Sequence, residues 1–322
     1  MKIGFTTSFP VEIVLGAGHH AIDLNNVFVM NNPQQLVTEA EQKGFPRNIC
    51  SWIKGMYSTI SAYHIDVVIG IVQGDCSNTH SLMSILEDQR IHVLAFSYPY
   101  HRDYASLNQE IKKLEVYFQT DRSKTIKAKN ECDFIRKKLN ELDRLTWQEN
   151  KVRGGENHLW LVSSSDFNGD IQRYESDLDH FLQEVSLRTP FKNIVRLGYV
   201  GVPPIITDLY DYLEAKKASI VYNEVQRQFS MFHLESDIVN QYLRFTYPYT
   251  IKERIEDINL EIERRNLDGI ISYTQSFCHR QLDHILLKKH LKCPVLQLEG
   301  DQPGLLDERS KIRLDSFLEM LL

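Results

Sequence analysis

The segment DGIISYTQSFCHRQLDHILLKKHLKCPVLQLEGDQ, from Asp268 to Gln302, decides the fold. Its first part, 269–273, is a short apolar run rich in β-branched residues, which is typical of a buried strand. Apolar residues then recur at helical spacing, at Leu282, Ile285, Leu286 and Leu291. This spacing predicts a helix that begins at or just after Cys278, and the apolar run 295–298 predicts a second strand. The thiol of Cys278 thus lies where a strand passes into a helix, at the edge where open α/β sheets bind ligands. A helix start also stabilises a thiolate.

The same alternation of strand and helix appears in both halves of the chain. In the first half, 67–72 and 92–96 predict buried strands, and in the second half 194–200 and 219–223 do so. Between them, dense charge and helical spacing from Tyr104 to Glu149 predict a helical insert. We therefore predict an α/β fold with mostly parallel sheets. The expected domains are an N-terminal lobe with a helical extension, 1–150, and a C-terminal lobe, 151–322.

Composition restricts the class of protein. The chain has 322 residues, 42% hydrophobic and 25% charged, with a net charge of -6, which is typical of a soluble globular protein. No basic face is visible, so we expect no nucleic-acid partner. No apolar run approaches the roughly 20 residues that cross a bilayer, and the N-terminus does not resemble a signal peptide. We therefore expect a cytoplasmic protein without membrane contact, in which the five cysteines are thiols or metal ligands.

Three cysteines share one predicted position. Cys50, Cys76 and Cys278 each precede a helix, and the last two also follow a buried strand. Three thiolates suit a 4Fe-4S cluster with one iron left open, or a zinc ion with an open position. The alternative is that all three are inert, buried thiols, which are common in protein cores. Cys132 and Cys293 are assigned to packing, and no catalytic side chain is assigned.

Several motifs, in order, resemble the 2-hydroxyacyl-CoA dehydratase and benzoyl-CoA reductase family, and in particular the dehydratase D-component. Relatives of this family include the double-cubane cluster proteins. The similar stretches are Phe9-Pro10-Val11-Glu12-Ile13, Ala17-Gly18, Cys50-Ser51-Trp52-Ile53-Lys54, Gly74-Asp75-Cys76-Ser77, Arg254, Asp268-Gly269-Ile270-Ile271, Phe277-Cys278, Pro294-Val295-Leu296, Glu299-Gly300-Asp301, Arg309, Arg313 and Phe317. The resemblance covers both lobes and is weakest from about 112 to 151.

The resemblance implies a fold, a cofactor and partners. It implies two Rossmann-like lobes and a 4Fe-4S cluster held by Cys50, Cys76 and Cys278, which in the double-cubane proteins is part of an 8Fe-9S cluster. It implies a homodimer, or a heterodimer with a related subunit, and an ATP-hydrolysing iron–sulfur activator that delivers low-potential electrons. In the dehydratases, one electron turns the thioester carbonyl of a 2-hydroxyacyl-CoA into a ketyl radical, which drives loss of the hydroxyl group.

Three functions remain open at this point. The first is a radical-based dehydratase subunit, the second a homodimeric reductase of small molecules, and the third a non-catalytic, cluster-binding electron carrier. The chain is short for a catalytic dehydratase subunit, and no coenzyme A pocket is evident. Four charged residues match the family pattern, yet salt bridges on helix surfaces explain them more simply: Glu12, Arg254, Arg309 and Arg313.

Overall fold

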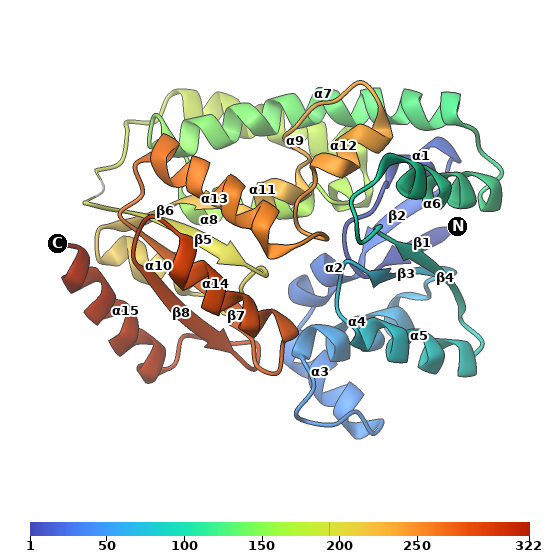
Figure 1. Ribbon diagram of the computed structural model, residues 1–322, viewed down its shortest axis with the longest axis horizontal. Coiled ribbons are helices and arrows are strands. Elements are labelled where there is room, and N and C mark those ends of the chain that lie inside the picture. Colours follow the sequence, from blue (N-terminus) through green and yellow to red (C-terminus); the bar gives the residue numbers. More distant parts are fainter. Residues whose placement is uncertain (193) are drawn as a thin grey trace. The chain divides into compact units, whose positions relative to one another are not determined.

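The chain folds into helices and two four-stranded sheets, in a computed structural model that describes residues 1–192 and 194–322 (Figure 1). The strands are β1 (Lys2–Phe5), β2 (His20–Asp23), β3 (Val67–Gln73), β4 (His92–Ser97), β5 (Val195–Gly201), β6 (Ala218–Asn223), β7 (Gly269–Gln275) and β8 (Val295–Gly300). The helices of the first half are α1 (Glu12–Gly16), α2 (Leu24–Met30), α3 (Pro33–Gln42), α4 (Ser51–Tyr63), α5 (Asn78–Asp88), α6 (Tyr104–Tyr117) and α7 (Arg122–Trp147). Those of the second half are α8 (Gly154–Ser163), η1 (Phe167–Gly169), α9 (Ile171–Ser186), α10 (Leu209–Ala215), α11 (Glu224–Phe229), α12 (Ile238–Arg244), α13 (Ile251–Arg265), η2 (His279–Leu282), α14 (Asp283–His290) and α15 (Glu308–Leu321).

Both sheets are parallel and share one topology. The first has the strand order β2-β1-β3-β4 and the second β6-β5-β7-β8, so each is ordered second, first, third, fourth along the chain. Every strand pairing is parallel. The predicted α/β fold with two parallel sheets is therefore confirmed, and the strand order is that of doubly wound, flavodoxin-like sheets.

The apolar runs in the sequence form the inner strands. All of β7 is buried, as are the first five residues of β3, because helices cover both faces of a parallel sheet. One apolar core packs α4 and α5 against β3 around Val68, and another packs α13 and α14 against β7 around Ile270. These cores place the amino ends of the helices and the carboxyl ends of the strands at one edge of each sheet.

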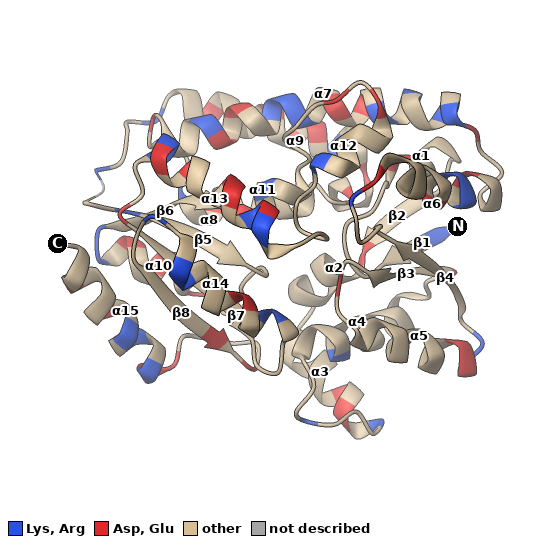
Figure 2. Cartoon of the chain, in the orientation of Figure 1, with Lys and Arg blue, Asp and Glu red and all other residues tan. Residues whose placement is uncertain are grey.

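The predicted helical insert, which follows the first sheet and precedes the second along the chain, is confirmed as α6 and α7. The Asp103 side chain caps α6 by accepting a hydrogen bond of 2.8 Å from the backbone N–H of Ser106. Charged residues of both signs are dense along α7 (Figure 2). No helix among the described residues has the length and apolar character needed to cross a membrane.

The chain forms two compact units, each assembled from separate segments. Unit 1 comprises 1–137, 163–176 and 228–249, and unit 2 comprises 138–162, 177–227 and 250–322. The first sheet belongs to unit 1 and the second to unit 2. The predicted domain boundary at residue 150 lies inside the segment 138–162 of unit 2.

Candidate functional site

Two of the three predicted cysteines occupy equivalent places in the two sheets. The strand order reverses beside β1 and β3 in the first sheet, and beside β5 and β7 in the second. Such a switch point leaves a crevice at the carboxyl ends of the strands, which is where open α/β sheets bind ligands. Cys76 lies three residues after the end of β3 and Cys278 three residues after the end of β7. Each unit therefore presents one thiol at its switch point.

The third cysteine, Cys50, lies at the start of the helix that leads into β3. It is the N-cap residue of α4, a helix of 13 residues. Because α4 returns the chain to the start of β3, its amino end lies at the same edge of the sheet as the end of that strand. The positive end of the helix dipole favours a thiolate at this position. In unit 2 the matching N-cap, at the start of α13, is Thr250, which carries a hydroxyl in place of a thiol.

The turn that carries Cys76 depends on a glycine. Gly74 has a φ of +98°, and a Cβ there would lie 2.7 Å from the Pro248 side chain. Any larger residue would therefore push the turn away from its packing partner. The first turn of α5 follows directly, and the backbone N–H of Thr79 donates a hydrogen bond of 3.0 Å to the Cys76 carbonyl.

The turn that carries Cys278 is tightly bonded and locally strained. The backbone N–H of Cys278 donates a hydrogen bond of 3.1 Å to the Gln275 carbonyl. The Cys278 carbonyl accepts a hydrogen bond of 3.1 Å from the backbone N–H of Gln281. The preceding residue, Phe277, has a φ of +62°, which is unusual for an aromatic residue. Strained backbone of this kind persists where the surroundings hold it, and it is concentrated at functional sites.

A buried ionic array, formed by Glu224, Arg254 and Asp283, supports the Cys278 turn. The Arg254 guanidinium donates hydrogen bonds of 2.7 and 2.8 Å to the two carboxylate oxygens of Glu224, and both side chains are almost fully buried. Arg254 also donates 3.3 Å to Asp283, the first residue of the helix that follows the Cys278 turn. The backbone N–H of Gly201 donates 3.0 Å to Glu224. The array thus ties the ends of β5 and β6 to the start of α14.

This array corrects one interpretation of the sequence. We expected Glu12 and Arg254 to form salt bridges on helix surfaces, and this is wrong for both. Glu12 is fully buried, where it accepts 2.7 Å from Arg136. The missed residue Glu224 directly follows β6, and a carboxylate immediately after a buried strand is the signal that could have indicated it.

Buried polar atoms near two of the cysteines have no hydrogen-bond partner among the described residues. They are Oγ1 of Thr79, in the first turn after Cys76, and Oγ1 of Thr274 and Oε1 of Gln275, at the end of β7 before Cys278. Such atoms are costly to leave unpaired, so a bound group would stabilise them. Cys50, Cys76 and Cys278 are each half-buried thiols. Partly accessible, soft sulfur ligands beside unsatisfied polar groups fit an iron–sulfur cluster.

The described residues contain no group of three or more His, Cys, Asp or Glu side chains close enough to hold a metal ion. Cys50 and Cys76 belong to unit 1 and Cys278 to unit 2. The three-cysteine site therefore stays a prediction.

Within unit 1, the segments that carry Cys50 and Cys76 flank one cavity of about 300 Å³. Ile49 and Ile53 line it on one side, and Asn78 and Leu82 on the other. The Gln89 side chain, at its wall, donates 2.7 Å to the Tyr57 hydroxyl. A mostly apolar cavity with a few polar groups is typical of a small-molecule site.

The remaining titratable groups support different roles. Burial raises the pKa of the Cys132 thiol well above its usual range, and burial together with Asp268 raises the pKa of Cys293 to about 11. Both therefore stay protonated near neutral pH, in keeping with packing. Burial and the positive charge of Arg280 lower the pKa of His279, next to Cys278, so this imidazole is neutral at pH 7.

The family is established by comparison with known proteins. Residues 6–321, nearly the whole chain, match the family model of the D-component of 2-hydroxyglutaryl-CoA dehydratase. A search of curated proteins finds no match. The D-component is a part of a dehydratase, so the match implies a dehydratase-type enzyme. The chain, with its thiols at the switch points of two similar sheets, belongs to the 2-hydroxyglutaryl-CoA dehydratase D-component family.

Proposed function

We propose that this chain is an iron–sulfur subunit that dehydrates a 2-hydroxyacyl-CoA, with Cys50, Cys76 and Cys278 as the ligands of a 4Fe-4S cluster. The observation that carries the proposal is the equivalent position of Cys76 and Cys278, each three residues after the strand that borders a switch point. The family match over residues 6–321 supports the reaction class. Three thiolates leave one position for a substrate oxygen.

When bound, the cluster would supply a low-potential electron to the thioester. The chain's own residues would bind the cluster and fix its orientation. The amino end of α4 favours the Cys50 thiolate, Gly74 permits the Cys76 turn, and Arg254 holds the Cys278 turn through Asp283. The electron would come from an ATP-hydrolysing iron–sulfur activator, and the active form would be a dimer with a second copy or a related subunit.

Anaerobic purification followed by iron and sulfide analysis tests the cluster. Alanine at any one of Cys50, Cys76 and Cys278 should remove most bound iron, because two thiolates hold a cluster poorly. Alanine at Cys132 or Cys293 serves as the matched control and should leave the iron content unchanged. Equal loss of iron from all five variants would contradict the assignment.

The reaction is tested with the loaded protein under anaerobic conditions. We expect turnover of 2-hydroxyacyl-CoA esters after reduction by a titanium(III) or europium(II) compound, and none with air-exposed protein. Reduction of azide or acetylene without turnover of the thioester would instead indicate a small-molecule reductase of the double-cubane type. Full activity in air without a reductant would refute both functions.

A further inference from the structure

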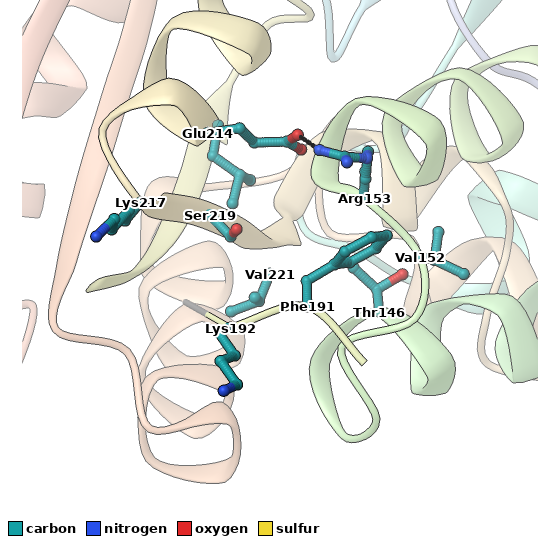
Figure 3. A pocket seen from close by; sticks show the side chains of 10 residues that line it. Thr146, Val152, Arg153, Phe191, Lys192, Glu214, Lys217, Ser219 and Val221 are labelled. Carbon is teal, nitrogen blue, oxygen red and sulfur yellow. Dashed lines mark hydrogen bonds and ion pairs between the residues drawn. The ribbon is translucent and has the colours of Figure 1, made fainter. Parts of the chain in front are cut away.

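A second cavity lies at the opposite edge of the sheet of unit 2 from Cys278. It has a volume of about 190 Å³, and β6 forms one wall through Ser219, Ile220 and Val221 (Figure 3). These residues belong to the first two-thirds of the strand, and Lys217 immediately precedes it. Cys278, by contrast, follows the carboxyl end of β7. The cavity is therefore separate from the Cys278 turn.

The charge around this cavity is positive, although the whole chain carries -6. Its lining includes the cations Arg153, Lys192 and Lys217 and one anion, Glu214, which gives a local charge of +2. Arg153 forms an ion pair with Glu214. Neither lysine forms a salt bridge within the described residues. A concave, positive surface on an acidic protein concentrates anions.

The arginine is held in place by an aromatic ring. The guanidinium carbon of Arg153 lies 4.5 Å from the centre of the Phe191 ring. Figure 3 shows the Arg153 head directed at Glu214, and the side chains of Lys192 and Lys217 extending away from the other lining residues. The flexible stems of the lysines allow both ammonium groups to swing over a ligand, whereas the planar guanidinium is already oriented.

The rest of the lining is apolar apart from two hydroxyl groups. Val152, Phe191 and Val221 provide hydrocarbon surface. The hydroxyl group of Ser219, in the centre of the view in Figure 3, makes no side-chain hydrogen bond within the described part of the chain. A ligand that fits must therefore combine a strongly charged anionic head with a small hydrocarbon part.

We propose that this cavity binds a small phosphate monoester. Its two negative charges match the local charge of +2, its oxygens suit the arginine and the Ser219 hydroxyl, and its ester group suits the apolar wall. A cavity of about 190 Å³ is too small for a nucleotide or for coenzyme A, since sites for drug-sized ligands span roughly 300–1,000 Å³. The proposal does not depend on the cysteine cluster.

Calorimetric titration with phenyl phosphate, inorganic phosphate and benzyl alcohol tests this site. We expect saturable binding of phenyl phosphate, weaker binding of inorganic phosphate and none of the uncharged alcohol. Lys217→Gln and Arg153→Gln should each weaken phenyl phosphate binding by about 10-fold, since each removes one charge-assisted contact. Lys252→Gln, on the exposed face of α13, makes the same change of charge elsewhere in unit 2 and should have no effect.

A gain of affinity provides the sharpest test. Glu214→Gln removes the one anion from the lining and releases Arg153, so it should tighten phenyl phosphate binding. A misfolded variant could not produce this result. If Glu214→Gln and Lys217→Gln bind phenyl phosphate with the same affinity as Lys252→Gln, or if the wild type does not bind it, the proposal is wrong.

Discussion

Two buried carboxyl groups, those of Asp23 and Asp166, lie together in unit 1. A carboxylate oxygen of Asp166 accepts a hydrogen bond of 2.7 Å from the backbone N–H of Asp23. The Ser165 hydroxyl donates a hydrogen bond of 2.6 Å to the Asp23 carboxylate. Burial, and then the charge of Asp23, raise the pKa of Asp166 to about 7. Burial also raises the pKa of Asp23. The folded protein therefore binds a proton that the unfolded chain releases.

This pair predicts that the protein loses stability as the pH rises. The pKa of Asp166 is 3.8 when unfolded and about 7 when folded, so the loss occurs between these two values. Asp23→Asn keeps the shape of the side chain but removes the negative charge beside Asp166. Its free energy of unfolding relative to wild type should therefore increase by on the order of 1–2 kcal/mol between pH 5 and pH 8. Urea unfolding across this range measures the change.

Asp103→Asn is the control for this titration. The pKa of Asp103 is lowered, because its carboxylate accepts hydrogen bonds from Ser106. Its contribution to stability is present above the unfolded pKa and is lost only as the pH falls through the still lower folded pKa. The difference between this variant and wild type should thus stay constant from pH 5 to pH 8. A constant difference for Asp23→Asn as well would rule out the shared proton.

At the scale of the secondary-structure elements, the array of Glu224, Arg254 and Asp283 connects the starts of α11 and α14 with α13. Lysine at position 254 cannot reproduce a two-pronged contact with Glu224 and also reach Asp283. Arg254→Lys should therefore loosen the Cys278 turn, and in the metal-free protein iodoacetamide should modify Cys278 several-fold faster, as read by mass spectrometry. Cys50 and Cys76, in unit 1, should react at unchanged rates.

Arg264→Lys is the matched control on the same helix. Arg264 pairs with Glu261 at 3.2 Å, but its side chain is more than half exposed, and such pairs contribute little. In the Arg264→Lys variant, Cys278 should react with iodoacetamide at the wild-type rate. The role of Arg254 would be disproved by equal rates in both variants.

The strands and helices beside the cysteines were predictable because their signals are local. A continuous apolar run indicates a buried parallel strand, so the positions of β3, β7 and the thiols after them were predicted correctly. The ionic partners were not, since Arg254 is 30 residues from Glu224 and Asp23 is 143 residues from Asp166. Both separations are too long for helical or strand periodicity to indicate a contact, so these partners can be identified only from the folded structure.

At the scale of the whole molecule, exposed apolar side chains lie in the Cys278 turn and in the helical segments that directly follow it. Phe277, Leu282 and Ile285 are 63%, 71% and 65% exposed, although the spacing of the last two is that of a buried helix face. Exposed apolar groups gathered in one short segment often mark an interaction surface. We expect this surface to contribute to the predicted dimer.

Replacement of Leu282 and Ile285 together by serine should weaken self-association. Each buried side chain contributes roughly 1.5–3 kcal/mol, so the dissociation constant of the dimer should rise by 10-fold or more. Sedimentation equilibrium measures this constant. Leu260→Ser, an exposed leucine on α13, is the control and should not change it. A double variant with the wild-type dissociation constant would show that the dimer uses another surface.

The segmented construction of unit 1 affects how the protein folds during synthesis. The fully buried Glu12 carboxylate lies 2.9 Å from the Tyr242 hydroxyl, as does the Phe9 carbonyl oxygen. Tyr242 leaves the ribosome 233 residues after Phe9, because unit 1 includes 228–249. Domains generally fold from the N-terminus as they emerge, at about 5–20 residues per second. The cationic partner of Glu12, Arg136, emerges earlier, but the hydrogen bonds that Tyr242 donates to Glu12 and to Phe9 can form only after residue 242 of the 322 has been synthesised.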